Sequence, residues 1–192
     1  MSFLPGLSLG SNRNKLRICV ALYWRNSQFR NDDSCDSYHS AILLVPKSIP
    51  MVTGTTWRFH AINDLRSTIY GGQEIFWSYE PSHTALRTSR LLALVFLGKL
   101  SPDVSPGDLD AIFHNYVPVI QNDPTYTCNT WTRSAIQVMK NQGIIDAPIP
   151  PEMIMANGER FADNFELVHS LPVPTCDIYG QSIDSLVKTL LV

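Results

Sequence analysis

The segment from Asp123 to Gly143 contains the residue whose chemistry is easiest to predict from the sequence, Cys128. An Asp-Pro turn is followed by apolar residues at helical spacing, which predicts a helix with Thr127 as its N-cap and Gly143 at its end. A thiol in the first turn of a helix lies near unpaired backbone N–H groups and the positive end of the helix dipole. Both favour the thiolate, so Cys128 is a candidate nucleophile.

A cysteine nucleophile needs a proton acceptor within reach, and the acceptor needs a group that orients it. His39 lies near the start of an apolar strand predicted over 38–45, and His60 lies on the next predicted strand, over 55–62. Adjacent antiparallel strands can place both rings on one face, with opposed Cβ atoms about 5 Å apart. We therefore expect His39 beside the start of the Cys128 helix as general base and later acid, with His60 orienting it.

The same residues have a purely structural interpretation, which stays open at this point. A strand histidine is often a hydrogen-bonded core residue, and a cysteine often packs as a small hydrophobe. Cys19, inside an apolar run, is predicted to lie in the core, whereas Cys35 and Cys176 are predicted to be loop thiols. The other histidines lie in polar contexts, where we expect solvated rings: His83, His114 and His169.

Composition limits the classes of function. The chain has 192 residues, 44% of them apolar, with a formal net charge of −2, which suits one domain and gives no footprint for duplex DNA. It has no transmembrane run and no secretory signal pattern, so we expect a cytoplasmic protein. The four cysteines are scattered without metal-ligand spacing. We therefore expect neither a metal nor an organic cofactor.

The order of elements predicts an α+β fold, an antiparallel sheet with helices packed on it. Strands are predicted over 16–24, 38–45, 55–62, 74–79 and 88–97. Helices are predicted over 103–116, 128–143 and 152–168, the last interrupted at Gly158, before a final amphipathic segment over 182–191. We expect residues 1–14 to form a flexible leader and residues 15–192 a single domain.

Three motifs resemble the circularly permuted papain-like enzymes, which include relatives of lecithin:retinol acyltransferase and the PPPDE peptidases. They are Tyr-His-Ser-Ala-Ile-Leu-Leu-Val over 38–45, Arg-Phe-His-Ala-Ile over 58–62, and Thr-Cys-Asn-Thr-Trp over 127–131. In that fold a strand histidine precedes the cysteine, which begins a helix. The resemblance implies a Cys128–His39–His60 constellation, and the helix start suggests the backbone N–H groups of Cys128 and Asn129 as oxyanion donors.

The ordered set also resembles an uncharacterised group of fungal proteins with Tyr-His and Cys-x-x-Trp motifs. Ser40 and Thr127 depart from these patterns, which usually have an aromatic residue and an asparagine there. The departures keep nucleophile and base but leave the substrate class open. The sequence therefore predicts a cysteine-dependent hydrolase or acyltransferase acting on a small-molecule or peptide acyl substrate, in an unknown oligomeric state. The alternatives are a non-catalytic binding or structural module on the same scaffold and a biosynthetic enzyme with a thioester or aminoacyl donor.

Overall fold

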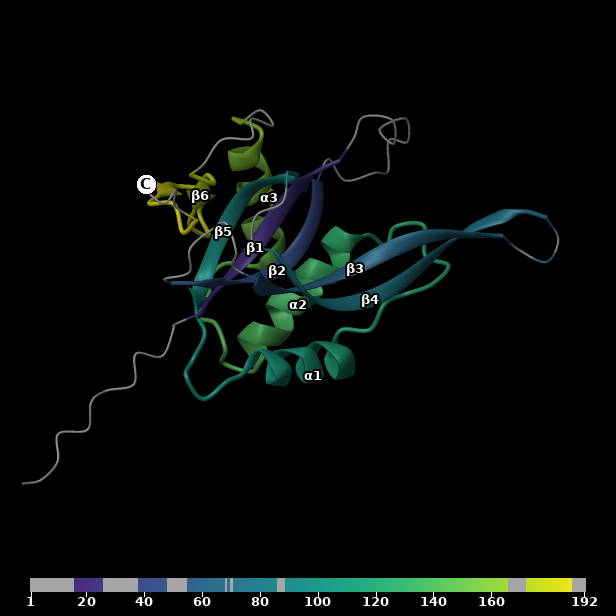
Figure 1. Ribbon diagram of the computed structural model, residues 1–192, viewed down its shortest axis with the longest axis horizontal. Helices are drawn as coiled ribbons and strands as arrows, with labels where there is room; N and C mark the ends of the chain where they lie inside the picture. Colours follow the sequence, from purple (N-terminus) through teal and green to yellow (C-terminus); the bar gives the residue numbers. More distant parts are fainter. Residues whose placement is uncertain are drawn as a thin grey trace, which may run out of the picture.

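The protein is α+β, a seven-stranded, mostly antiparallel open sheet with three helices packed on it (Figure 1). The computed structural model describes residues 16–25, 38–47, 55–67, 69, 71–85, 89–165 and 172–187. The strand order is β4-β3-β2-β1-β5-β6-β7, and only β5 and β6 pair in parallel. The fold class predicted from the sequence is confirmed at this level.

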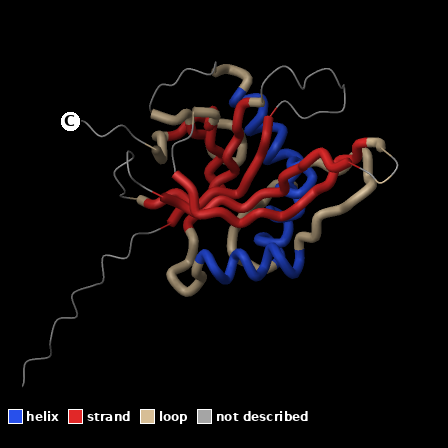
Figure 2. The backbone as a smooth tube through the Cα atoms, turned by 45° about the vertical axis from the view of Figure 1, so that its right-hand side comes forward, coloured by secondary structure: helices blue, strands red, loops and turns tan. Residues whose placement is uncertain are grey.

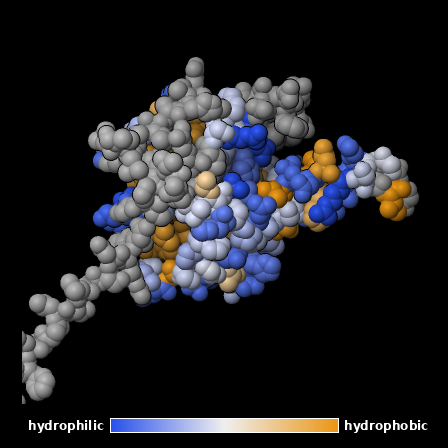
Figure 3. All heavy atoms as spheres, in the orientation of Figure 1, coloured by the Kyte–Doolittle hydropathy of each residue, from blue (hydrophilic) through white to orange (hydrophobic). Residues whose placement is uncertain are grey.

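The five long strands are β1 (Leu16–Trp24), β2 (Tyr38–Pro46), β3 (Thr55–Ser67), β4 (Gln73–Ala85) and β5 (Leu91–Lys99). The first two and the fifth are almost entirely buried, as their continuous apolar runs predict. Strands β3 and β4 are longer than predicted, because paired residues continue along a hairpin whose outer part is exposed and includes the apolar side chains of Leu65 and Ile75. This hairpin reaches beyond the rest of the sheet (Figure 1), and polar and apolar residues alternate along its surface (Figure 3).

Strand β2 meets β3 over a short stretch only. The paired residues are Ile42 with Phe59 and Leu43 with Arg58, whereas β1 and β2 pair along their whole length. The described pairing therefore leaves the start of β2, where His39 lies, outside the β2–β3 ladder.

All three helices pack on one face of the sheet, shown in Figure 2 beside the strands, and the main hydrophobic core lies between the two layers. They are α1 (Pro106–Tyr116), α2 (Cys128–Asn141) and α3 (Pro151–Ala162). From β2, this helical face receives the even-numbered residues, such as Ile42 and Leu44. The opposite face carries a second, smaller cluster, to which Val173 and Val187 of the C-terminal segment contribute.

Helix α3 corrects one prediction, because Gly158 lies inside the helix and does not interrupt it. A Cβ at this position would stand 2.5 Å from Val95 Cγ2, so the glycine permits α3 to lie close against β5. The predicted continuation of this helix over 166–168 falls outside the described residues.

One prediction near the C-terminus is wrong. Cys176 is not a loop thiol but a fully buried residue of β6 (Thr175–Cys176), which pairs with β5. The final amphipathic segment begins with the short strand β7 (Ser182–Ile183), which closes a hairpin with β6. Residues 1–15, Cys35 and His169 lie outside the described residues. Within the described part of the chain, no helix combines the length and apolarity that crossing a membrane would need.

Candidate active site at the start of strand β2

Helix α2 begins at Cys128, as its sequence predicts. Thr127 has an extended backbone, and its hydroxyl accepts hydrogen bonds from the N–H groups of Asn129, at 3.2 Å, and Thr130, at 3.3 Å. The Thr130 hydroxyl in turn accepts from the Thr127 N–H at 2.7 Å, which completes a reciprocal capping box. The helix start is therefore fixed by local side-chain chemistry, and Cys128 occupies its first turn.

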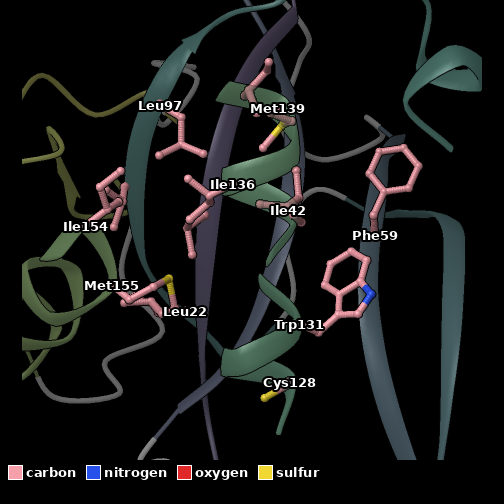
Figure 4. Packing of buried hydrophobic residues seen from close by; sticks show 14 of the residues in the cluster. Leu22, Ile42, Phe59, Leu97, Cys128, Trp131, Ile136, Met139, Ile154 and Met155 are labelled. Atoms are coloured by element: carbon pink, nitrogen blue, oxygen red, sulfur yellow. The ribbon is translucent and has the colours of Figure 1, made fainter. Parts of the chain in front are cut away.

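The Cys128 sulfur meets a guanidinium and the main chain of β2. Nη2 of Arg25, the residue that follows β1, donates to Cys128 Sγ at 3.1 Å, and Sγ lies 4.0 Å from the carbonyl oxygen of Tyr38. Cys128 has no exposed surface and lies at the N-terminal end of α2, one turn before Trp131 (Figure 4). The guanidinium and the helix N-terminus favour the thiolate, whereas burial opposes it.

Two imidazoles and a carboxylate form a hydrogen-bonded row. His39 Nε2 lies 2.7 Å from His60 Nδ1, and His60 Nε2 lies 3.3 Å from Glu80 Oε1. His60 and Glu80 are directly opposed residues of the β3–β4 hairpin. The predicted meeting of His39 and His60 on one face is confirmed. His60 therefore engages Nε2 of His39, and Nδ1 of His39 takes no part in this row.

The sheet separates this row from the sulfur, contrary to the expectation that the His39 ring stands beside the start of the Cys128 helix. Tyr38 and Ser40 face the helices, since Tyr38 belongs to the main core and Ser40 Oγ lies 3.0 Å from Thr132 Oγ1 of α2. His39, between them, faces the other side, where its ring lies beside that of Tyr23. Cys128 and His39 therefore flank the same stretch of β2 from opposite faces.

Arg25 links the two faces electrostatically. It contacts Cys128, and its charge is also one of the causes that lower the pKa of His39. The sulfur and the imidazole thus lie around the same end of the sheet. A proton that passed directly from the Cys128 sulfur to the His39 ring would have to travel around this end of the sheet, past the main chain of Tyr38.

Both histidines are held neutral. Burial is the main cause that lowers the pKa of His39, followed by the charges of His60, Arg25 and Arg58. Burial also lowers the pKa of His60, with Arg58 as the second cause. Glu80 opposes this effect only weakly, because its side chain is 44% exposed and water screens its charge. A neutral imidazole is the form that can accept a proton near neutral pH.

The oxyanion donors predicted from the sequence are only partly in place. The Asn129 N–H is engaged by the Thr127 hydroxyl, so it belongs to the cap. The N–H of Cys128 is at the first position of the helix, where backbone N–H groups point out of the N-terminus. The Asn129 side chain donates from Nδ2 to Glu159 Oε1 at 2.5 Å, and its buried Oδ1 has no partner among the described residues.

Comparison with known proteins gives one match. Residues 15–148 match a family described as a family of unknown function, DUF6914. The chain belongs to this family. No curated protein and no solved structure matches it. The matched residues include Arg25, His39, His60, Glu80 and Cys128, so the elements of the candidate site all fall within the DUF6914 region.

Sequence reasoning missed two members of the site in this DUF6914 protein. Arg25 directly follows the strand predicted over 16–24, and Glu80 directly follows the strand predicted over 74–79. The position of Glu80 could have been predicted from the sequence, because antiparallel pairing of the two strands through a hairpin places it opposite His60. Arg25 had no such signal, since its contact with Cys128 spans 103 residues of sequence.

The other described cysteines lack these features. Burial raises the pKa of both thiols, to about 12 for Cys176 and further for Cys19. His83 and His114 are exposed, as predicted. Among the described residues, no group of three or more His, Cys, Asp or Glu side chains converges as metal ligands would. His39, His60 and Glu80 contact one another in a row, with His60 in the middle.

Proposed function

We propose that this DUF6914 protein is a cysteine-dependent acyl-transfer enzyme, a hydrolase or an acyltransferase, on a circularly permuted papain-like scaffold. The observation that supports it is the convergence at the start of β2. A cysteine at a capped helix N-terminus, with a guanidinium on its sulfur, lies against the residue next to the first histidine of an imidazole–imidazole–carboxylate row. The resemblance of the sequence motifs adds the order of histidine and cysteine along the chain.

In this proposal the Cys128 thiolate, paired with Arg25, attacks the carbonyl carbon of an acyl substrate. A C–S bond forms as the carbonyl becomes an oxyanion, and His39 holds the proton that the thiol released. The oxyanion collapses, the leaving group departs with that proton, and an acyl-enzyme remains. Water, an amine or an alcohol then attacks the thioester carbonyl and gives its proton to His39. The C–S bond breaks, the acyl product leaves, and the proton returns to the Cys128 sulfur.

The remaining residues have positioning roles. His60 fixes the tautomer and orientation of His39, and Glu80 fixes those of His60, as the third group of a catalytic triad does. Arg25 also carries a charge that can stabilise the oxyanion once the sulfur is acylated. Because Cys128 is wholly buried against Tyr38, substrate reaches it only when side chains around the start of β2 move apart.

The test is the reactivity of the thiols at pH 6 to 7. The native protein is treated with iodoacetamide and the adducts are mapped by peptide mass. We expect Cys128 to react faster than Cys19 and Cys176, and to lose this advantage in His39→Gln and Arg25→Gln. Labelling of Cys128 at the rate of the two other buried thiols, or labelling that ignores both substitutions, contradicts the proposal.

Substrate class is tested by intact mass. Activated esters, acyl thioesters and aminoacyl esters are offered separately, with Cys128→Ser and Cys176→Ser as matched variants. A mass increase equal to the acyl group, retained in Cys176→Ser and lost in Cys128→Ser, identifies the nucleophile. A response to thioester or aminoacyl donors alone favours the biosynthetic enzyme over a peptidase.

A non-catalytic module on the same scaffold is the second candidate, and a specific observation favours it. Cys128 is fully buried within the main core, on the face of the sheet opposite the histidine row. In that case Arg25 and Cys128 form a structural contact. Cys128→Ala then leaves every binding property intact, and no acyl donor adds mass to the native protein.

A further inference from the structure

The face of the β3–β4 hairpin opposite the helices carries hydrogen-bonding atoms that nothing in the described structure satisfies. They are Thr56 Oγ1, Arg58 Nε and Ser82 Oγ, each buried and without a partner. Thr56 is only 3% exposed, and Arg58 retains 21% of its side-chain surface. Buried polar atoms are nearly always paired, and an unsatisfied one costs about 1–3 kcal/mol. Three together indicate a missing partner.

The strand register places the three side chains in one patch. Arg58 and Ser82 are directly opposed, and Thr56 lies two residues before Arg58 on the same strand. All three therefore face the same side of the sheet. The next pair along this face is His60 with Glu80, so the patch adjoins the histidine row.

The patch combines one positive charge with several hydrogen-bond donors. The Arg58 guanidinium lies over the Tyr23 ring, 5.9 Å from its centroid, hydrogen-bonds the Tyr23 side chain, and reaches Glu80 at 3.8 Å through Nη2. Its Nε–H is left to donate, and two hydroxyls beside it can donate as well. Charge on Arg25 and Arg58 already acts on His39. A guanidinium edge flanked by hydroxyls matches the oxygens of a carboxylate or phosphate.

We propose that Thr56, Arg58 and Ser82 form a binding site for an oxyanionic group, a carboxylate or a phosphate, beside the histidine row. That this group belongs to the acyl substrate rests on the proposed function. The anion site itself does not, because its binding is measured without turnover. An acyl substrate with a negatively charged end would lie with that end on Arg58 and its reactive carbonyl toward the start of β2.

The experiment titrates the full chain with glutarate and with inorganic phosphate, each against sodium chloride at matched ionic strength. Binding is followed by calorimetry and by the imidazole proton resonances of His39 and His60. We expect saturable binding that shifts both resonances and that weakens about tenfold or more in Arg58→Gln, because a charge-assisted hydrogen bond is lost. The preferred arm identifies carboxylate or phosphate as the natural group.

Arg66→Gln is the matched control. Arg66 lies on the same hairpin with its guanidinium 3.4 Å from the Phe76 ring centroid, so the substitution removes the same charge away from the patch. Ser82→Ala is the second variant in case Arg58→Gln fails to fold, and we expect it to weaken binding several-fold. No saturable binding of either anion, or equal binding by Arg58→Gln and the native chain, overturns the inference.

The outcomes also separate the two proposals. An acyl-enzyme at Cys128 without anion binding removes the anion site and keeps the enzyme. Anion binding that depends on Arg58, without any acyl-enzyme, keeps the site and removes the acyl-transfer function.

Discussion

The two faces of the central sheet differ in what they contribute at the start of β2. The helical face is apolar and closely packed, with Cys128 and Trp131 buried against the sheet. The opposite face holds the ionisable groups, with His39, His60 and Arg58 in contact or in electrostatic reach of one another. Strand β2 contributes residues to both faces because successive side chains of a strand point to opposite sides. The sheet therefore separates the cysteine from the histidines, and the two faces are closest to one another at the start of β2.

The helical face should carry most of the stability, and Trp131→Ala tests this with the largest expected effect. Trp131 has no exposed surface, stacks on Tyr79 and donates from Nε1 to the Val117 carbonyl at 3.1 Å. We expect a loss of about 3–5 kcal/mol in the free energy of unfolding, measured by urea denaturation. Tyr116→Ala, at a side chain that is 60% exposed, is the control and should stay within about 0.5 kcal/mol.

The opposite face should dominate the dependence of stability on pH. Both histidines have pKa values lowered from 6.5 to about 3, so below pH 6.5 the unfolded chain binds protons that the folded chain does not. Stability is then full above pH 6.5 and falls as the pH falls toward 3, because the unfolded chain takes up protons that the folded chain excludes.

Urea titrations at pH 7, 6 and 5 measure this slope. His60→Gln should reduce it, whereas His114→Gln, at an exposed position, should leave it unchanged. A native slope of the opposite sign would show that the histidines are charged in the folded protein.

A double-mutant cycle on Ser40 and Thr132 measures the interaction energy of the contact between β2 and α2. Their hydroxyl oxygens lie 3.0 Å apart and are buried. Ser40→Ala should cost about 1–3 kcal/mol, because the Thr132 hydroxyl loses its partner, and Thr132→Val should cost a similar amount. The double variant should cost much less than the sum of the two. Additive losses would mean that the two hydroxyls do not interact in solution.

The smallest expected effect concerns the cap of α2. Thr127→Ala removes the acceptor for the N–H groups of Asn129 and Thr130, which should cost about 0.5–2 kcal/mol. It should also slow the labelling of Cys128, because the first turn that holds the sulfur loosens. Ser105→Ala removes the equivalent capping box of α1 and serves as the matched control. It should cost a similar free energy and leave the labelling rate unchanged.

The sequence determined much of the local structure. Continuous apolar runs specified β1, β2 and β5, and the capping residue with helical spacing specified α2 and the position of Cys128 at its start. It also placed His39 and His60 together, because hairpin-like pairing of neighbouring strands brings their rings to one face. These features depend on residues near one another in the chain or on strands next to one another.

Only the tertiary structure decided which face of β2 the helices cover. Both sets of alternating residues in this strand are buried, so apolar patterning does not distinguish the face of Ser40 and Ile42 from the face of His39 and Ala41. The contact of Arg25 with Cys128 and the patch around Arg58 likewise join distant segments. The alternation of side chains determines which residues share a face. Packing against α2 determines which of the two faces the helices cover, and as a result the sulfur and the imidazoles lie on opposite faces.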